Sequence, residues 1–308
     1  MAQLKNTTIN DTGFIRLPLG TSAQRPSGTQ GMVRYNTQTN VIEFFNGSSW
    51  IGVGLLDGSS QSTAAVSAEA IKSLTGTNAN TTYWIALPTV GATNLFCIMD
   101  SAWNGGGWIM TMKATRSTTF NWSSGYWTGI NLLNETQINQ NDGDAKFNSF
   151  NYFQSKDIMA RWPDIGQGGC ISNVGNWTWL QNNFYGGSRV TLTDWFNSVA
   201  GGRRFYQDAK TWCGWASGVF SSQKDVRFYG FNYSNNQNLA RTRWGFGWNE
   251  NGGGLYPNGN MSSDDVSGGI GMTGTQQGQV QYSAGDYIGC CQDTTGINRS
   301  ARVEVYVR

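Results

Sequence analysis

The residue types that could do chemistry gather in one glycine-rich stretch, which reads RWGFGWNENGGGLYPNGNMSSDDVSGGIGM over residues 243–272. Amide and carboxylate oxygens in flexible backbone suit Ca²⁺, which takes about six to eight hard oxygen ligands. Aromatic faces beside such oxygens suit the stacking of a sugar ring. The sequence therefore predicts a calcium set and a ligand-binding set. The metal set is Asn249, Glu250, Asp264 and Asp265, joined by Asp286 from the later stretch SAGDYIGCC, and the ligand set is Trp244, Trp248 and Tyr256.

A plainer interpretation of this stretch stays open, in which the carboxylates only cap turns and pair with Arg241 and Arg243. A second acidic loop, NQNDGDAKF, contains Asp142 and Asp144 but lacks the terminal bidentate Glu of an EF-hand. We expect that loop to be a solvated turn. Two stretches that alternate aromatic and amide side chains, residues 175–187 and 227–238, fit either a carbohydrate-binding groove or the strands of a tryptophan-rich core.

Catalysis is not expected. The chain has no histidine, which excludes Ser-His-Asp, Cys-His and histidine-metal chemistry. Glycan cleavage would need two carboxylates about 5–9.5 Å apart in a cleft, and the acidic cluster near aromatics is already assigned to calcium. We therefore predict a protein that is not an enzyme.

Composition restricts the partners. Charged residues make up 13% of the chain, against a usual ~25%, and the formal net charge is +2 with no run of Lys or Arg. Nothing supplies the electrostatic footprint that nucleic acid or anionic lipid would need. No window approaches the ~20 apolar residues of a membrane span, and the opening MAQLKNTTINDTG lacks the apolar core of a secretory signal. We expect no nucleic-acid partner, no membrane insertion, and assembly in the cytosol.

Five cysteines are present, an odd number, and none is spaced as CxxC or as a zinc set: Cys97, Cys170, Cys213, Cys290 and Cys291. The adjacent pair is too close for an ordinary unstrained bridge. With no signal to an oxidising compartment, we expect most of these thiols to be buried and inert and no structural disulfide to form during assembly.

The elements that must position these residues divide into two parts. Three short apolar or aromatic runs over residues 14–53, GMVRYN, VIEFFN and SWIGV, are joined by the turn sequences TQTN and NGSS, which predicts a small β-meander. So short a piece cannot bury enough apolar surface alone, so we expect it to associate, as a homotrimer or with a docking partner. We place an N-terminal module at 1–56, a Gly/Ser/Thr-rich linker at 57–66 and a second domain at 67–308.

The second domain is predicted to be mainly β with short helices, a β-rich α+β fold. SAEAIKSLTG, residues 67–76, has a Ser N-cap, an acidic first turn and a Gly stop, which indicates a short helix. The run GGGW at residues 105–108 is expected to be a folding feature, because no phosphate-binding helix with Lys or Ser/Thr follows it.

The N-terminal part resembles a known module. LPLGTSAQRPSGTQGMVRYNTQTNVIEFFNGSSW is similar to a short segment of bacteriophage tail-fibre and other virion structural proteins, with a GT-x-x-QRP entry, GM-x-RYNT, an acidic-aromatic strand and a final Trp. The resemblance covers nearly all of residues 13–53. It implies a virion protein that attaches to other virion proteins through this module.

The rest of the chain resembles fibrinogen-related domains of the intelectin type. TTYWIALP, LFCIMD and GGGWIMTMKA arrive in that family's order, and residues 147–164 and the final SARVEVYVR are similar to its mid-domain and closing strands. In intelectin-like lectins a loop resembling NENGGGLYP and DDVSG builds the calcium and glycan site, which implies roles for Asn249, Glu250 and Asp265. The family's histidines and the fibrinogen D-x-D loop are absent here. The upstream partner of Cys97 is also absent, so Cys97 should be free.

Together these resemblances imply a bacteriophage virion protein, a fibre or fibre-like appendage, assembled in the cytoplasm of a bacterial host. Its C-terminal domain would be displayed outwards and bind host surface glycans, with Ca²⁺ as the implied cofactor. The alternative is a capsid or tail decoration that binds no ligand.

Overall fold

The computed structural model describes residues 12–198, 203–204, 226–234, 240–248, 266–273, 281–288 and 300–308. It confirms the prediction of a β-rich α+β fold, since it is mainly β with three sheets and few, short helices. The chain divides into two compact units, Met1–Leu56 and Asp57–Arg308. Residues 57–66, which the sequence suggests as a linker, therefore belong to the second unit.

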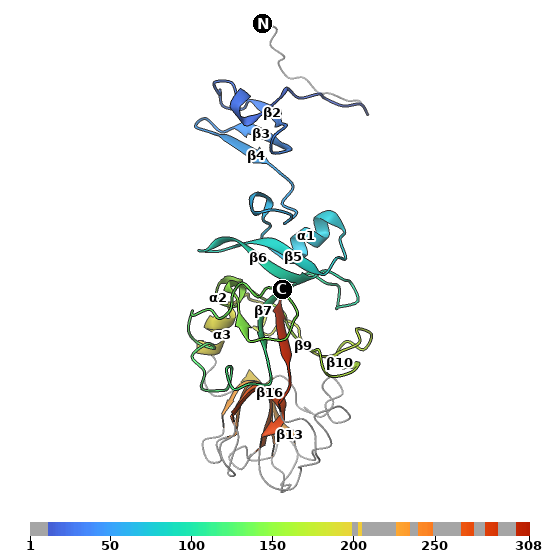
Figure 1. Ribbon diagram of the computed structural model, residues 1–308, viewed down its shortest axis with the longest axis vertical. Coiled ribbons are helices and arrows are strands. Elements are labelled where there is room, and N and C mark those ends of the chain that lie inside the picture. Colours follow the sequence, from blue (N-terminus) through green and yellow to red (C-terminus); the bar gives the residue numbers. More distant parts are fainter. Residues whose placement is uncertain are drawn as a thin grey trace. The chain divides into compact units, whose positions relative to one another are not determined.

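The first unit is a four-stranded sheet in the order β1-β2-β3-β4 (Figure 1). Strands β2, β3 and β4 pair antiparallel and β1 adds parallel to β2. Local chemistry sets the turns: Asn40 adopts a left-handed φ of 56° between β2 and β3, and the Asn46 side chain accepts from two backbone N–H groups before β4. The elements are β1 Leu19–Gly20, a 3₁₀ turn η1 Ser22–Gln24, β2 Val33–Asn36, β3 Val41–Phe45 and β4 Trp50–Val53.

The second unit begins with a segment that completes a sheet edge. The backbone N–H of Trp84 donates to the carbonyl of Gly58, and Ala65 forms a parallel bridge with Ile85. This segment therefore covers the outer edge of strand β5 (Thr81–Leu87). The 3₁₀ turn η2 (Gln61–Thr63) lies within it, and helix α1 (Ala68–Thr75) follows. The Ser67 hydroxyl accepts from Ala70 N–H at 3.0 Å and Gly76 ends the helix at φ 67°, as the sequence predicts.

The main sheet of this unit has eight strands in the order β10-β11-β9-β17-β7-β6-β5, with β8 paired to β7 (Figure 1). Strand β17, from the end of the sequence, lies between β7 and β9, and all five of its residues are buried. Its members are β5 Thr81–Leu87, β6 Gly91–Ile98, β7 Trp108–Ala114, β8 Ala145–Lys146, β9 Ile158–Trp162, β10 Gly168–Gly169, β11 Trp177–Gln181 and β17 Val303–Val307.

A second, five-stranded antiparallel sheet has the order β12-β13-β14-β15-β16. Its aromatic side chains join those of the main sheet in one core: the Trp179 ring lies 5.3 Å from Phe246 and 4.4 Å from Trp162. The strands are β12 Arg203–Arg204, β13 Val226–Ser234, β14 Arg241–Trp248, β15 Val266–Thr273 and β16 Gln281–Ile288, and the helices α2 Asn148–Tyr152 and α3 Leu192–Ser198 complete the unit.

The GGGW run forms the turn between β6 and β7. Gly105, Gly106 and Gly107 all have left-handed φ, between 74° and 91°. A Cβ on Gly106 would lie 2.3 Å from the Met99 carbonyl oxygen, so no other residue fits. Trp108 is fully buried and donates to the Trp103 carbonyl at 2.7 Å. The run is thus a folding feature, as expected.

The structure describes two of the five cysteines, Cys97 and Cys170, and they differ in state. Cys97 is buried and free, as predicted, and burial raises the pKa of its thiol, which keeps it inert. Cys170, however, is disulfide-bonded, so it is not one of the free, inert thiols that the sequence predicts for most of the cysteines. Cys213, Cys290 and Cys291 lie outside the described residues. Among the described residues, no helix has the length and apolar character needed to cross a membrane.

Candidate functional site

Most residues of the predicted calcium and ligand sets lie outside the described part of the chain: Asn249, Glu250, Tyr256, Asp264 and Asp265. Trp248 and Asp286 are described only by their backbone, in β14 and β16. The strand register nevertheless relates their positions, because Trp248 pairs with Val266 across β14 and β15, and Ser267 pairs with Ile288 across β15 and β16. Trp248, the start of β15 and the end of β16 therefore lie at one end of this sheet.

Trp244 requires a correction, because it offers no exposed face to a sugar. Its side chain is only 1% exposed, stacks on Phe231 at 5.4 Å and donates from Nε1 to the Tyr229 hydroxyl at 3.1 Å. It points into the core because its strand alternates, placing it on the same face as Phe246. Trp177, Trp179, Phe184 and Tyr229 are buried too, so the aromatic-amide stretches build core strands rather than a groove.

Arg243 binds groups other than the carboxylates that the sequence suggests as its partners: the Trp122 carbonyl and the Asn232 side chain. Its guanidinium donates to the Trp122 carbonyl at 2.8 and 2.9 Å and to the Asn232 side chain at 3.0 Å, and it lies over the Trp122 ring at 4.2 Å. These contacts fix the loop containing Trp122 to β14.

The second acidic loop is an anchor rather than a solvated turn. The Asp144 carboxylate accepts from the backbone and hydroxyl of Thr115 and from the hydroxyls of Ser117 and Thr119, at 2.6 to 3.0 Å. Asp142 pairs with Arg116 at 3.3 Å. Each Asp144 carboxylate oxygen accepts two of these hydrogen bonds, so neither oxygen is free to bind a metal. Among the described residues, no group of three or more acidic or cysteine side chains is placed to hold a metal ion.

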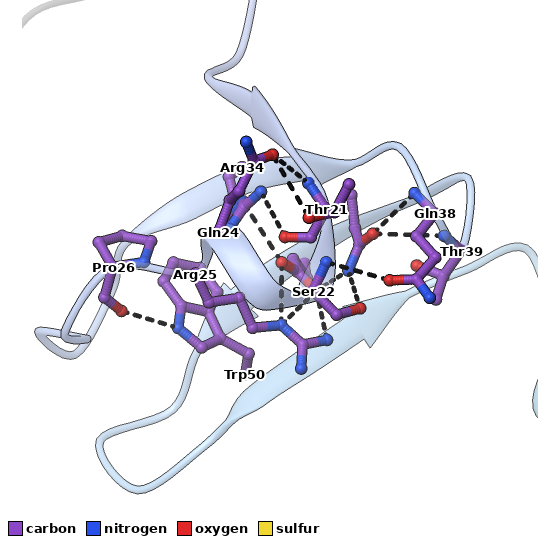
Figure 2. A network of polar contacts seen from close by, with 11 residues as sticks. Thr21, Ser22, Gln24, Arg25, Pro26, Arg34, Gln38, Thr39 and Trp50 are labelled. Atoms are coloured by element: carbon purple, nitrogen blue, oxygen red, sulfur yellow. Dashed lines mark hydrogen bonds and ion pairs between the residues drawn. The ribbon is translucent and has the colours of Figure 1, made fainter.

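The first unit contains a polar cluster around the buried Glu43 on one face of its sheet (Figure 2). Arg25 donates to Glu43 from Nη2 at 2.8 Å and from Nε at 3.2 Å, Arg34 lies 3.4 Å from the same carboxylate, and Asn36 donates to it at 3.0 Å. Arg34 also donates to the Thr21 carbonyl, and the Trp50 indole donates to that of Pro26. Hydrogen bonds from Arg25, together with those from Asn36, lower the pKa of Glu43 although burial opposes the shift.

The opposite face of that sheet is apolar and uncovered. Cross-strand partners share a face, so the register places seven side chains together there. Among residues 12–56, the buried residues are Gly20, Arg34, Asn36 and Glu43, and no apolar side chain is buried. Val53 is 54% exposed and Ile42 41%. We call this surface the apolar face: Leu19, Val33, Tyr35, Ile42, Phe44, Ile51 and Val53.

The second unit contains a pocket of about 320 Å³ where β6 separates from β7. Only Cys97 and Ile98 of β6 pair with β7, because β8 takes the β7 positions Met112 and Lys113 instead. The gap between the first half of β6 and the residues after β8 is the pocket. Its lining comprises Trp84, Ala92, Thr93, Asn94, Leu95, Glu135, Thr136, Phe147 and Asn148.

Unpartnered polar groups surround this pocket. Trp84 and Asn94 face one another across β5 and β6, both partly exposed. The Asn94 Oδ1 atom is buried and has no hydrogen-bond partner. Within the described chain, the side chains of Glu135, Thr136 and Asn148 also form no hydrogen bond or ion pair. The sequence does not reveal this site, because Glu135 and Thr136 lie 41 and 42 residues after Asn94 and belong to no motif.

A comparison of the sequence with models of known protein families, and with curated proteins, finds no significant match.

Proposed function

We propose that this protein is a structural component of a bacteriophage virion that assembles through its N-terminal sheet and binds a host surface glycan through its C-terminal domain. The observation that carries the proposal is the contrast between the two units. The first buries only polar side chains among its described residues and leaves its apolar ones exposed or half-buried, whereas the second has an extensive apolar and aromatic core of its own.

The apolar face fits a copy of itself. Three of the four charged side chains in residues 12–56, Arg25, Arg34 and Glu43, pair with one another on the opposite face, so identical surfaces can meet without like-charge repulsion. A β-sheet of this size without a hydrophobic core has marginal stability on its own. Burying the apolar face against other copies supplies that core, and we propose a homotrimer.

The experiment measures the mass of the full chain by sedimentation velocity. Wild type should sediment as a trimer, and Ile42→Asp should reduce it to a monomer, because the new charge would be buried unpaired at the centre of the apolar face. Ile42 is already exposed within one chain, so the substitution leaves its contacts there largely intact. Thr39→Asp, in the exposed β2–β3 turn, is the matched control. A monomeric wild type would contradict the assembly role.

Glycan binding is tested separately, by adsorption of the full chain to purified bacterial envelope polysaccharides. Wild type should be retained, and the Ile42→Asp monomer should be retained more weakly, because three linked domains bind with avidity. If no envelope glycan retains the trimer, the adhesion role is wrong and a decoration protein without a ligand takes its place.

A further inference from the structure

We propose that the pocket between β6 and the residues after β8 is a binding site for an uncharged sugar residue of a glycan, with Trp84 as its aromatic platform and Asn94 as its hydrogen-bond acceptor. The inference rests on the proposed glycan-binding function and assigns it to residues other than those of the predicted calcium and ligand sets.

The first argument is the state of Asn94. Its Oδ1 atom is buried without a partner, although buried polar groups in folded proteins almost always have one. Its cross-strand neighbour on β5 is Trp84, and no described residue donates a hydrogen bond to it. Because the atom is shielded from solvent, a donor group of a ligand can satisfy it once the amide turns toward the pocket that Asn94 lines. Sugar hydroxyls and N-acetyl N–H groups are such donors.

The second argument is the combination of side chains. Sugar sites combine an aromatic surface, which covers the C–H face of the ring, with a few amides, carboxylates and hydroxyls that bind its hydroxyl groups. Trp84 supplies the aromatic surface here. Asn94, Glu135, Thr136 and Asn148 supply acceptors and donors that no described residue occupies. At about 320 Å³, the pocket is at the lower end of ligand sites, which suits one or two sugar rings.

The charge of the lining restricts the ligand further. Among the lining residues that the structure describes, Glu135 is the sole charged one, and none is Lys or Arg. An anionic sugar such as a uronic acid would therefore place its carboxylate near that of Glu135 without a cation to compensate. The pocket should prefer neutral hexoses or N-acetylhexosamines over uronic acids.

The architecture supports a preformed site. Trp84 and Asn94 stand on paired strands, and the backbone of Trp84 is held on its other side by Gly58 and Ala65. Phe147 is buried at the pocket floor. Sites on sheet strands are held more precisely than sites on loops, which lowers the entropic cost of binding.

The test uses the full chain and saturation-transfer NMR with the methyl glycosides of glucose, galactose, N-acetylglucosamine and galacturonic acid. Wild type should bind at least one neutral glycoside and bind the galacturonide more weakly. Asn94→Leu and Trp84→Ala should weaken neutral binding by roughly tenfold or more, because each removes a contact that the ligand makes in the pocket. Gln154→Ala, which alters a separate pocket of the same unit, should bind as wild type does.

Asn94→Leu also separates binding from folding. If Asn94 serves a ligand, replacing its unpartnered amide by an apolar group should leave the melting temperature unchanged or raise it while binding is lost. If it serves the fold, the melting temperature should fall and binding should persist. Glu135→Gln should diminish the discrimination against the galacturonide.

The outcomes distinguish this proposal from the function on which it rests. Neutral glycosides that bind wild type and all variants equally would overturn the pocket and leave glycan binding elsewhere in the domain intact. No binding of any neutral glycoside would also overturn the pocket, and retention on envelope polysaccharide would then decide the adhesion role independently.

Discussion

Glu43 is the residue on which the polar cluster of the first unit depends. It accepts hydrogen bonds from Arg25 and Asn36 and lies within 3.4 Å of Arg34, so three side chains lose their common partner when it is neutralised. Its pKa in the folded chain lies below the unfolded value of about 4.3. The stability that this carboxylate contributes is therefore complete at neutral pH. It begins to be lost as pH falls below the unfolded pKa of about 4.3 and is gone once pH has fallen through the folded pKa.

We predict that acid and Glu43→Gln have the same effect on this sheet. Hydrogen exchange measured by mass spectrometry, corrected for intrinsic rates, should show protected amides at residues 33–36 and 41–45 at pH 6 and weaker protection at pH 3. Glu43→Gln should lack that protection at both pH values. Full protection of these strands in the variant would show that the cluster contributes nothing.

Glu304 provides the internal control for that measurement. Burial raises its pKa, although Arg161 opposes the shift, so protonation on acidification relieves an unfavourable buried charge. The sign is opposite to that of Glu43: stability from this group rises as pH falls through the raised pKa. Amides of β17 should keep their protection over the pH range in which β2 and β3 lose theirs.

At the scale of elements, the turn between β6 and β7 depends on backbone conformation. We predict that Gly106→Ala destabilises the chain by at least about 2 kcal/mol, because a left-handed non-glycine residue costs about 1–2 kcal/mol and the new Cβ would collide with the Met99 carbonyl. Urea denaturation measures the loss. Gly125→Ala is the control, since nothing lies within 4 Å of its Cβ position. Equal stability of the two variants would contradict the role of the turn.

Elements with local signals could be predicted from sequence. Helix α1 was specified by its caps, and the β-meander by TQTN and NGSS, because turn and cap chemistry acts within a few residues. The alternation of side chains between the two faces of the sheet was also evident in VRYN and VIEFF. It did not indicate, however, which of the two faces is covered. The structure covers the face with Arg34 and Glu43 and leaves the apolar one open.

What depends on distant contacts could not be predicted. The burial of Trp244 follows from packing against Trp179 and Phe231, which come from two different sheets. The pocket arises because β8 displaces most of β6 from β7, a competition between segments about fifty residues apart. Disulfide bonding of Cys170 likewise depends on tertiary approach, which the spacing of the cysteines does not reveal.

At the scale of the whole molecule, calcium remains a prediction that thermal unfolding can test. If Asn249, Glu250 and Asp265 bind Ca²⁺, the ion stabilises the folded chain by mass action, by about 2.7 kcal/mol at roughly one hundred times its Kd. Calcium should therefore raise the melting temperature of the full chain by several degrees, and Glu250→Gln should abolish the rise by removing a charged ligand.

Asp142→Asn is the matched control for calcium, because this aspartate pairs with Arg116 and belongs to the other acidic loop. It should respond to calcium as wild type does. A melting curve that chelator leaves unchanged would contradict calcium binding by this chain. Retention on envelope polysaccharide in the presence of chelator would then show that adhesion does not require the ion.

The position of β17 has a consequence for synthesis on the ribosome. β7 and β9 are complete by residue 162, but the strand that joins them begins at residue 303. At about 5–20 residues per second, roughly 140 residues take about 7–30 s to translate. For that time both strands present unpaired hydrogen-bonding edges on the nascent chain. Each copy is thus exposed to mispairing with its neighbours on the same messenger, and the chaperone capacity of the producing cell should set the yield of folded protein.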